Sequence, residues 1–320
     1  MVQVRVKSAV KHGLVRAGWF VDGDFWSIAM YGGPSPTELA PVPGARIPAI
    51  GARDVRDADA GFVADPFVVP DGDRWHMFFE VWNRATAKGE IAVAESRDAI
   101  TWSYRQIVLA EPHHLSYPQI IAWQGVHYMV PETSGRRRVT LYRATGYPTA
   151  WEPVGVLLEG LPFNDATLFR HGGRWWMLTE TAEDVASDTL RLYTAGDLAG
   201  PWEEHPHSPV VRGDARIARP GGSVVAHDGR LIRFAQDCAT DYGKRVRAFE
   251  ITALTPRAYA ERALGVVLEP SGSGWNGQGM HQVDAHQVGD GRWLACVDGR
   301  PVPGPVRAPA GRIPRTQRPR

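Results

Sequence analysis

Hydrophobic residues are grouped in short alternating runs that are separated by glycine-containing turns, a pattern typical of β-strands. The first full example is residues 62–68, an apolar run with Asp65 near its head. A turn around Gly72 follows, and a second apolar run over residues 74–80 ends in Glu80. The two runs predict a β-hairpin with ionisable side chains at the start of its first strand and the end of its second.

This hairpin recurs along the chain. Its second strands align without gaps, and each follows a glycine turn; they occupy residues 74–80, 126–132, 174–180, 230–236 and 292–298. Each ends in an acid or an amide: Glu80, Glu132, Glu180, Gln236 and Asp298. The units begin at Asp65, Tyr117, Asp165, Arg219 and, less regularly, within residues 281–286. A period of about 50 residues with four strands per unit predicts a β-propeller, and five units predict five blades.

The two ends of the chain complete this picture. Only two strands of the fifth unit precede residue 300, and the alternating run around Trp26 predicts N-terminal strands that close the ring. Residues 33–60, rich in Pro, Gly and Ala, predict a surface connection. We therefore expect an all-β, five-bladed β-propeller with four-stranded antiparallel blades over residues 1–300. A disordered Pro/Arg-rich tail is expected over residues 301–320.

The predicted blades direct their polar ends to one mouth. In a blade the first strand lies nearest the axis and the second runs antiparallel beside it, so unit heads and second-strand ends share one end of the ring. Tyr117 and Tyr242 are also candidates for stacking on a sugar ring. The residues expected to contact substrate there are Glu80, Tyr117, Arg219, Gln236, Asp237, Tyr242, His281 and Asp284.

These residues resemble a known family. Ala64-Asp65-Pro66, Asn164-Asp165-Ala166 and the five-unit pattern resemble the five-bladed propellers of glycoside hydrolase family 43. A closer resemblance is to the propeller domain that precedes the transferase part of plant glucosamine inositolphosphorylceramide transferases. It covers roughly residues 18–300, and it rests on residues 62–67, 130–134, 163–167 and 279–284.

The resemblance to family 43 implies a general-base Asp on blade one, an orienting Asp on blade three and a general-acid Glu on blade four. Asp65 matches the first position and Asp165 the second, but the blade-four position holds Arg219. Arginine does not donate a proton at neutral pH, which argues against ordinary inverting hydrolysis. With Asp65 as base, the acid would come from Glu180, Glu132 or Glu80, since crowding of carboxylates raises their pKa values. Glu180 is the first candidate and Glu132 the second.

Arg219 opens another possibility for the same mouth. A guanidinium near the axis favours a carboxylate or phosphate, so the substrate class includes acidic sugars, sugar phosphates and nucleotide sugars. The alternative is that Arg219 neutralises Asp65 or Asp165 within the protein, because buried charges are normally paired.

A metal is not required by this pattern. His281, Asp284 and His286 form the candidate cluster, but on a strand Asp284 and His286 face one way and His281 the other. We expect no cofactor and no structural zinc, and at most a single axial ion near these three residues.

Composition limits the partners. The 320 residues carry a formal net charge of +1 and 43% hydrophobic residues, which argues against a nucleic-acid or membrane surface. Two distant cysteines, no apolar signal sequence and no long apolar run predict a cytoplasmic location without membrane insertion.

Three functions remain open. The first is a glycoside hydrolase-like or glycosyl-transfer enzyme that acts on a sugar or sugar conjugate, and the second is a non-catalytic glycan-binding propeller. The third is a biosynthetic enzyme that acts on a small molecule without a sugar. The pattern leaves the oligomeric state unassigned.

Overall fold

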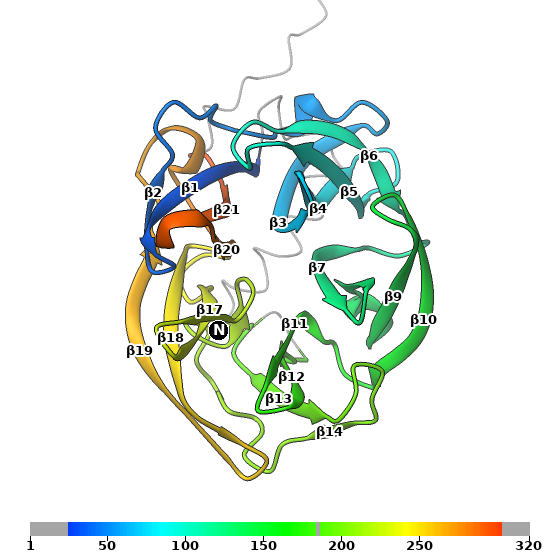
Figure 1. The fold of residues 1–320 in the computed structure, drawn as a ribbon, viewed down its shortest axis with the longest axis vertical. Helices are drawn as coiled ribbons and strands as arrows, with labels where there is room; N and C mark the ends of the chain where they lie inside the picture. The colour runs from blue at the N-terminus through cyan, green and yellow to red at the C-terminus, as the bar shows by residue number, and fades with distance from the viewer. Residues whose placement is uncertain (1–24, 184–185, 303–320) are drawn as a thin grey trace, which may run out of the picture.

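The computed structural model describes residues 25–183 and 186–302, which form five β-sheets arranged radially around a common axis (Figure 1). This arrangement confirms the predicted five-bladed propeller. Blade one contains β3 (Ala60–Asp71), β4 (Arg74–Asn83), β5 (Lys88–Ser96) and β6 (Ser103–Leu109). Blade two contains β7 (Ser116–Trp123), β8 (Val126–Glu132), β9 (Arg138–Gly146) and β10 (Ala150–Glu159).

The remaining blades follow the chain around the ring (Figure 1). Blade three contains β11 (Asn164–His171), β12 (Arg174–Glu180), β13 (Leu190–Ala195) and β14 (Trp202–Glu204). Blade four has an inner strand in two pieces, and contains β15 (Arg219–Pro220), β16 (Val225–His227), β17 (Arg230–Asp237), β18 (Arg245–Thr255) and β19 (Ala258–Leu268).

Blade five combines the two ends of the described chain. It contains β20 (Val283–Gln287), β21 (Trp293–Gly299), β1 (Ser27–Ser35) and β2 (Glu38–Pro41). β1 pairs antiparallel with β21 from Ser27–Gly299 to Gly33–Trp293. The first described strand is thereby hydrogen-bonded to the last one.

Two details of the N-terminal region differ from the sequence prediction. β1 is buried on both faces: Ser27 and Ala29 are as inaccessible to solvent as Ile28 and Met30. The reason is that adjacent blades cover both sides of this sheet. The expected surface connection over residues 33–60 contains the strand β2 and a 3-10 turn at Ala52–Asp54. Nearly all of the predicted tail lies outside the described residues.

The core lies between blades rather than within them. Five clusters of buried hydrophobic side chains each combine residues of two neighbouring blades. The cluster between blades five and one joins Ile28 and Met30 to Met77, Phe79 and other residues of blade one, so this junction is packed like the other four. No helix in the described part of the chain has the length and apolar character to cross a bilayer.

The heads of blades one, two and three share one irregularity. Ala64, Ser116 and Asn164 pair with Glu80, Glu132 and Glu180 of the second strands, and in each blade the register then shifts by one residue. The residues at these β-bulges, Asp65, Tyr117 and Asp165, have positive φ values of 53°, 46° and 51°. Such bulges redirect side chains. Here they direct Asp65 and Asp165 to the mouth of the ring, and Tyr117 across its axis to blades three and four.

Blade four lacks this bulge. Arg219 pairs directly with Gln236 and Pro220 with Ala235, without a register shift. Arg219 is therefore equivalent to Ala64, one residue before the position of Asp65, and the prediction that it occupies the head position was wrong by one residue. Gly222 explains the different path, because a Cβ there would lie 1.7 Å from the carbonyl oxygen of Val283.

Candidate functional site

The first group at the mouth surrounds Asp165. Its carboxylate accepts hydrogen bonds from Arg219 Nε at 2.6 Å and from Gln236 Nε2 at 2.7 Å. The same guanidinium lies 3.2 Å from Glu132 Oε2, which also accepts a hydrogen bond from the Asp165 backbone N–H. The side chain of Tyr242 lies under the guanidinium, with its ring centroid 5.3 Å away. Asp165 is thus held from several directions.

The second group surrounds Asp65. Its backbone N–H donates to Asp298 Oδ2 at 3.1 Å, and its Oδ2 accepts from the Tyr117 backbone N–H at 3.3 Å. His281 lies between the two acids, with Nε2 3.6 Å from Asp65 Oδ1 and Nδ1 2.7 Å from Asp298 Oδ2. Trp26 stacks on the imidazole at 4.0 Å with an angle of 11° between the planes, which fixes its orientation.

Burial and crowding perturb both aspartates. Burial raises the pKa of Asp65 to about 7. The charges of His281 and Arg219 lower this pKa, and those of Asp165 and Asp298 raise it. Burial also raises the pKa of Asp165 to about 7, against the lowering effect of the Arg219 guanidinium. Burial opposes protonation of His281, but the carboxylates of Asp298 and Asp65 outweigh it and raise its pKa. Both aspartates therefore titrate near neutrality, where general acids and bases are most effective.

The three glutamates at the second-strand ends have different surroundings. Both carboxylate oxygens of Glu180 accept hydrogen bonds inside blade three, from Asn164 Nδ2 at 2.7 Å and Ala182 N at 2.6 Å. Glu132 accepts from Ser134 Oγ in addition to its contact with Arg219. Glu80 is buried and lies 3.6 Å from His114 Nε2.

Four predicted substrate contacts have internal partners. Tyr117 is fully buried, and its hydroxyl bonds Thr167 and the Gly222 backbone N–H, so it links blades two, three and four across the axis. Asp237 pairs with Arg247 at 2.8 Å. Asp284 accepts from the Val68 backbone N–H at 2.8 Å, an inter-blade contact. Tyr242 packs edge-on against His281 at 5.5 Å in addition to its contact with Arg219.

The three residues of the candidate metal cluster do not converge, in keeping with the alternation of side chains along a strand. Asp284 and His286 are 2.7 Å apart, whereas His281 faces the mouth. The described residues instead offer Asp65, His281 and Asp298, whose ligand atoms all lie within 4.8 Å of one another. These two carboxylates and one imidazole form a donor set that suits a divalent cation. The same geometry also suits an imidazole oriented by one aspartate and directed at another.

Sequence reasoning overlooked two contributors. The sequence indicated Trp26 only as part of a strand pattern and did not indicate His114 as a candidate. His114 Nδ1 accepts a hydrogen bond from the Gly89 backbone N–H at 2.8 Å, which no local sequence pattern indicates. The gap-free alignment of second strands did place Asp298 with the other acids.

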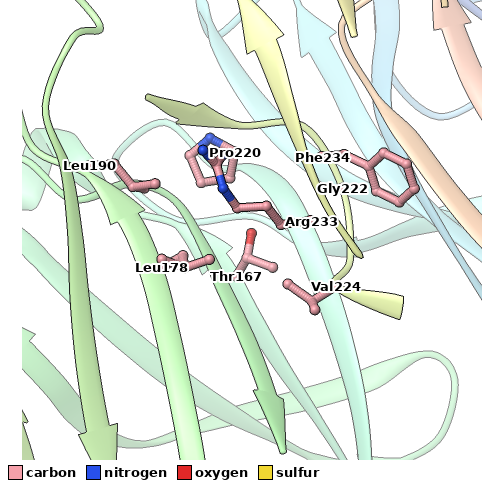
Figure 2. A pocket seen from close by; sticks show the side chains of 8 residues that line it. All are labelled: Thr167, Leu178, Leu190, Pro220, Gly222, Val224, Arg233 and Phe234. Atoms are coloured by element: carbon pink, nitrogen blue, oxygen red, sulfur yellow. The ribbon is translucent and has the colours of Figure 1, made fainter. Parts of the chain in front are cut away.

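A small hollow between blades three and four lies apart from these acids. It is lined mainly by apolar groups together with Thr167 and Arg233 (Figure 2). The Arg233 guanidinium is paired with both oxygens of Glu261, at 2.5 and 2.6 Å, and with the Ile217 carbonyl oxygen. Because its donors are directed to this pair, Arg233 stabilises blade four and is not a candidate for substrate binding.

Solved structures share this architecture. The catalytic domain of the Coprinopsis cinerea family 62 α-L-arabinofuranosidase matches with a TM-score of 0.57 and 13% identity, covering 86% of this chain and 97% of that one. An exo-1,5-α-L-arabinanase from a bovine ruminal metagenomic library matches with a TM-score of 0.54 and 13% identity, covering 76% and 94%. At these identities the likeness concerns the fold alone.

Sequence relatives are more similar. Glucosamine inositolphosphorylceramide transferase 1 of Oryza sativa subsp. japonica is 34% identical over 310 residues, covering 89% of this chain and 41% of the relative. The Arabidopsis thaliana protein of the same name is 32% identical, covering 86% and 39%. The chain thus spans about two-fifths of the length of these relatives. Residues 21–300 match the family described as glucosamine inositolphosphorylceramide transferase 1, N-terminal, and the chain belongs to this family.

Proposed function

We propose that this chain acts on a sugar conjugate at the axial mouth, with Asp65 as general base and Asp165 as the residue that orients it. The observation that carries the proposal is the pair of buried aspartates at equivalent bulges, both with a pKa raised to about 7. Two carboxyl groups that titrate near neutrality in one water-poor site are suited to proton transfer. The relatives whose names describe a sugar transferase support a carbohydrate substrate.

The charge of the mouth favours an amino sugar as the substrate class. Six carboxyl groups converge there, from Asp65, Glu80, Glu132, Asp165, Glu180 and Asp298. In the described residues the side chains that can oppose them with positive charge include Arg219, His281 and His114. An ammonium group on the substrate would offset this excess of acid. The names of the plant relatives specify glucosamine, which carries such a group.

The pairing of Arg219 bears on the anionic alternative. Its guanidinium already contacts Asp165 and Glu132, which favours the internal neutralising role over recognition of a substrate phosphate or carboxylate. We therefore rank anionic sugars below amino sugars.

A non-catalytic glycan-binding propeller is the second candidate. The observation that favours it is Arg219 itself, since blade four contributes a guanidinium to the site, whereas the resemblance to family 43 implies an acid from that blade. A binding module needs shape and charge at the mouth but no proton donor.

Turnover and binding separate the two candidates. We would incubate the protein with 4-nitrophenyl and methyl glycosides of glucose and glucosamine, in both anomers, and measure binding of glucosamine and glucose by calorimetry. Turnover that is lost in Asp65→Asn supports the enzyme. Binding without turnover of any glycoside supports the binding module and contradicts the enzymatic proposal.

A further inference from the structure

We propose that Glu80 is the general acid of this site and that the partly exposed His114 positions it. This inference rests on the proposed function, and it assigns the acid that Arg219 cannot supply. It replaces Glu180, which the sequence favoured for that role.

The geometry of His114 fixes its tautomer. Nδ1 accepts the hydrogen bond from the Gly89 backbone N–H at 2.8 Å, so a neutral imidazole must carry its proton on Nε2. That nitrogen lies 3.6 Å from Glu80 Oε1. The His114 side chain is 40% exposed, whereas that of Glu80 is 7% exposed. The imidazole therefore connects a buried carboxyl group with solvent.

Gly89 makes this approach possible. A Cβ at residue 89 would lie 2.6 Å from Glu80 Oε1, 2.7 Å from His114 Cε1 and 2.2 Å from the Leu115 carbonyl oxygen. No larger residue fits without displacing the pair. Trp82 borders the imidazole on another side, with ring centroids 5.9 Å apart, and so limits its rotation.

The surroundings of the other two glutamates make them poor acids. Glu132 contacts a guanidinium, which stabilises its ionised form. Burial raises the pKa of Glu180, but its two short hydrogen bonds act in the opposite direction and hold both carboxylate oxygens in place. The ionisable side chain that contacts the Glu80 carboxyl group, within the described part of the chain, is that of His114. A neutral imidazole 3.6 Å away stabilises an ionised carboxylate less than a guanidinium or two short hydrogen bonds do, so Glu80 keeps its proton more readily.

The electrostatic surroundings agree with this assignment. Burial raises the pKa of Glu80 well above its usual value, and the charges of Asp65, Glu132, Asp165 and Asp298 raise it further. Asp65 is the strongest of these charges, so the base in its ionised form helps to keep the acid protonated.

The step balances as a hydrolysis. Water attacks the anomeric carbon and gives a proton to Asp65, while the bond from that carbon to the leaving oxygen breaks and Glu80 gives its proton to that oxygen. Glu80 then takes a proton from solvent and Asp65 releases one to solvent, which restores both groups. No oxidant, reductant or further reactant is needed.

The first test needs no substrate. Long-range ¹H–¹⁵N spectra of uniformly labelled protein report the tautomer of each histidine, and the His114→Gln variant identifies the signals of His114. We expect the Nε2–H tautomer in the neutral wild-type protein. The Nδ1–H tautomer would overturn the assignment of His114, whatever the activity proves to be.

The second test uses the leaving group. Nitrophenolate departs with little need of a proton, whereas an alkoxide needs a general acid. We expect Glu80→Gln to reduce turnover of methyl glycosides about 100-fold more than turnover of 4-nitrophenyl glycosides. Glu180→Gln is the matched control and should change both rates by the same factor. Equal loss on both substrates in Glu80→Gln, with melting temperature retained, would overturn the acid role.

The positioning role of His114 has its own readout. We expect His114→Ala to reduce methyl glycoside turnover about tenfold, and added imidazole to restore part of it, because the side chain is partly exposed to solvent. A purely structural role would not respond to imidazole. If the wild-type protein turns over no glycoside, the proposed function fails. If the wild-type protein turns over glycosides, and Glu80→Gln keeps the wild-type ratio of methyl glycoside to 4-nitrophenyl glycoside turnover, only this inference fails.

Discussion

The heads of blade one and blade three place the same residue in the same backbone conformation and give it different neighbours. Asp65 and Asp165 both lie at a β-bulge, with φ values of 53° and 51°, and both are buried with a pKa raised to about 7. Asp165 is held by the guanidinium of Arg219 and the amide of Gln236. Asp65 accepts one backbone N–H and faces an imidazole 3.6 Å away.

This difference separates two roles. A carboxylate bound by strong side-chain donors is fixed in place, which suits a residue that orients others. A carboxylate with fewer donors can accept a proton from a substrate or water. Equivalent positions in a repeat therefore need not share a function, because each blade meets a different neighbour.

The largest effect should follow from removing the less restrained aspartate. Asp65→Asn is expected to reduce turnover about 100- to 10,000-fold, as loss of a general base does, with the circular dichroism spectrum unchanged. Because the base must be ionised, wild-type kcat/KM should fall as the pH drops below about 7. Asp165→Asn should reduce turnover less and keep this acidic limb. Wild-type rates in Asp65→Asn would refute the comparison.

The next effect tests the neighbour that distinguishes Asp165. Arg219→Met leaves Asp165 and Glu132 buried without their cation, so the free energy of unfolding should fall by about 3–5 kcal/mol in urea titrations. Adding Asp165→Asn should recover part of the loss. Arg143→Met, which removes an exposed pair with Glu152, is the control and should cost less than about 1 kcal/mol. Equal losses of unfolding free energy in Arg219→Met and Arg143→Met would show that the buried ion pair stabilises the protein no more than the exposed one.

The two aspartates should also differ in stability against pH. The folded-state pKa of Asp65 is about 7 against a usual value of 3.8, so the folded state binds more protons and wild-type stability falls as pH rises from about 4 to about 7. Asp65→Asn should remove this loss and stabilise the protein on the order of 2 kcal/mol at pH 8, with little gain at pH 4.

Asp165→Asn is the matched variant for that experiment. It removes the partner of Arg219, so we expect no comparable gain at pH 8. Thermal and urea unfolding at both pH values would measure the difference. A pH-independent effect of Asp65→Asn would contradict the raised pKa.

The smallest effect concerns the third bulge. Tyr117→Phe leaves the Gly222 backbone N–H without its hydroxyl acceptor, which should lower the free energy of unfolding by about 1–2 kcal/mol. Turnover should change little, since the hydroxyl binds protein groups on blades three and four. A large fall in turnover with unchanged stability would instead assign Tyr117 to substrate binding.

Much of the fold could be read from the chain. The second strands align without gaps because each must present the same alternation to its neighbours. This alignment singled out Glu80, Glu132 and Asp298, whose carboxyl groups lie near one another in the structure. The strand β2 was missed because its four residues, Glu38–Pro41, are largely exposed and carry no alternation. The one-residue displacement of Arg219 was missed because a bulge is a property of two paired strands.

By itself, the sequence determined the repeat, the number of blades and the chemical nature of the strand ends, since these follow from local periodicity. Only the tertiary structure decided that Asp165 and Glu132 share the Arg219 donor, and that Asp65 has fewer donors and can accept a proton. It also decided which histidine faces which carboxylate. The physical reason is that these contacts join residues that are far apart in the chain, as with Asp65 and Asp298 or Arg219 and Glu132, and they depend on how neighbouring blades approach.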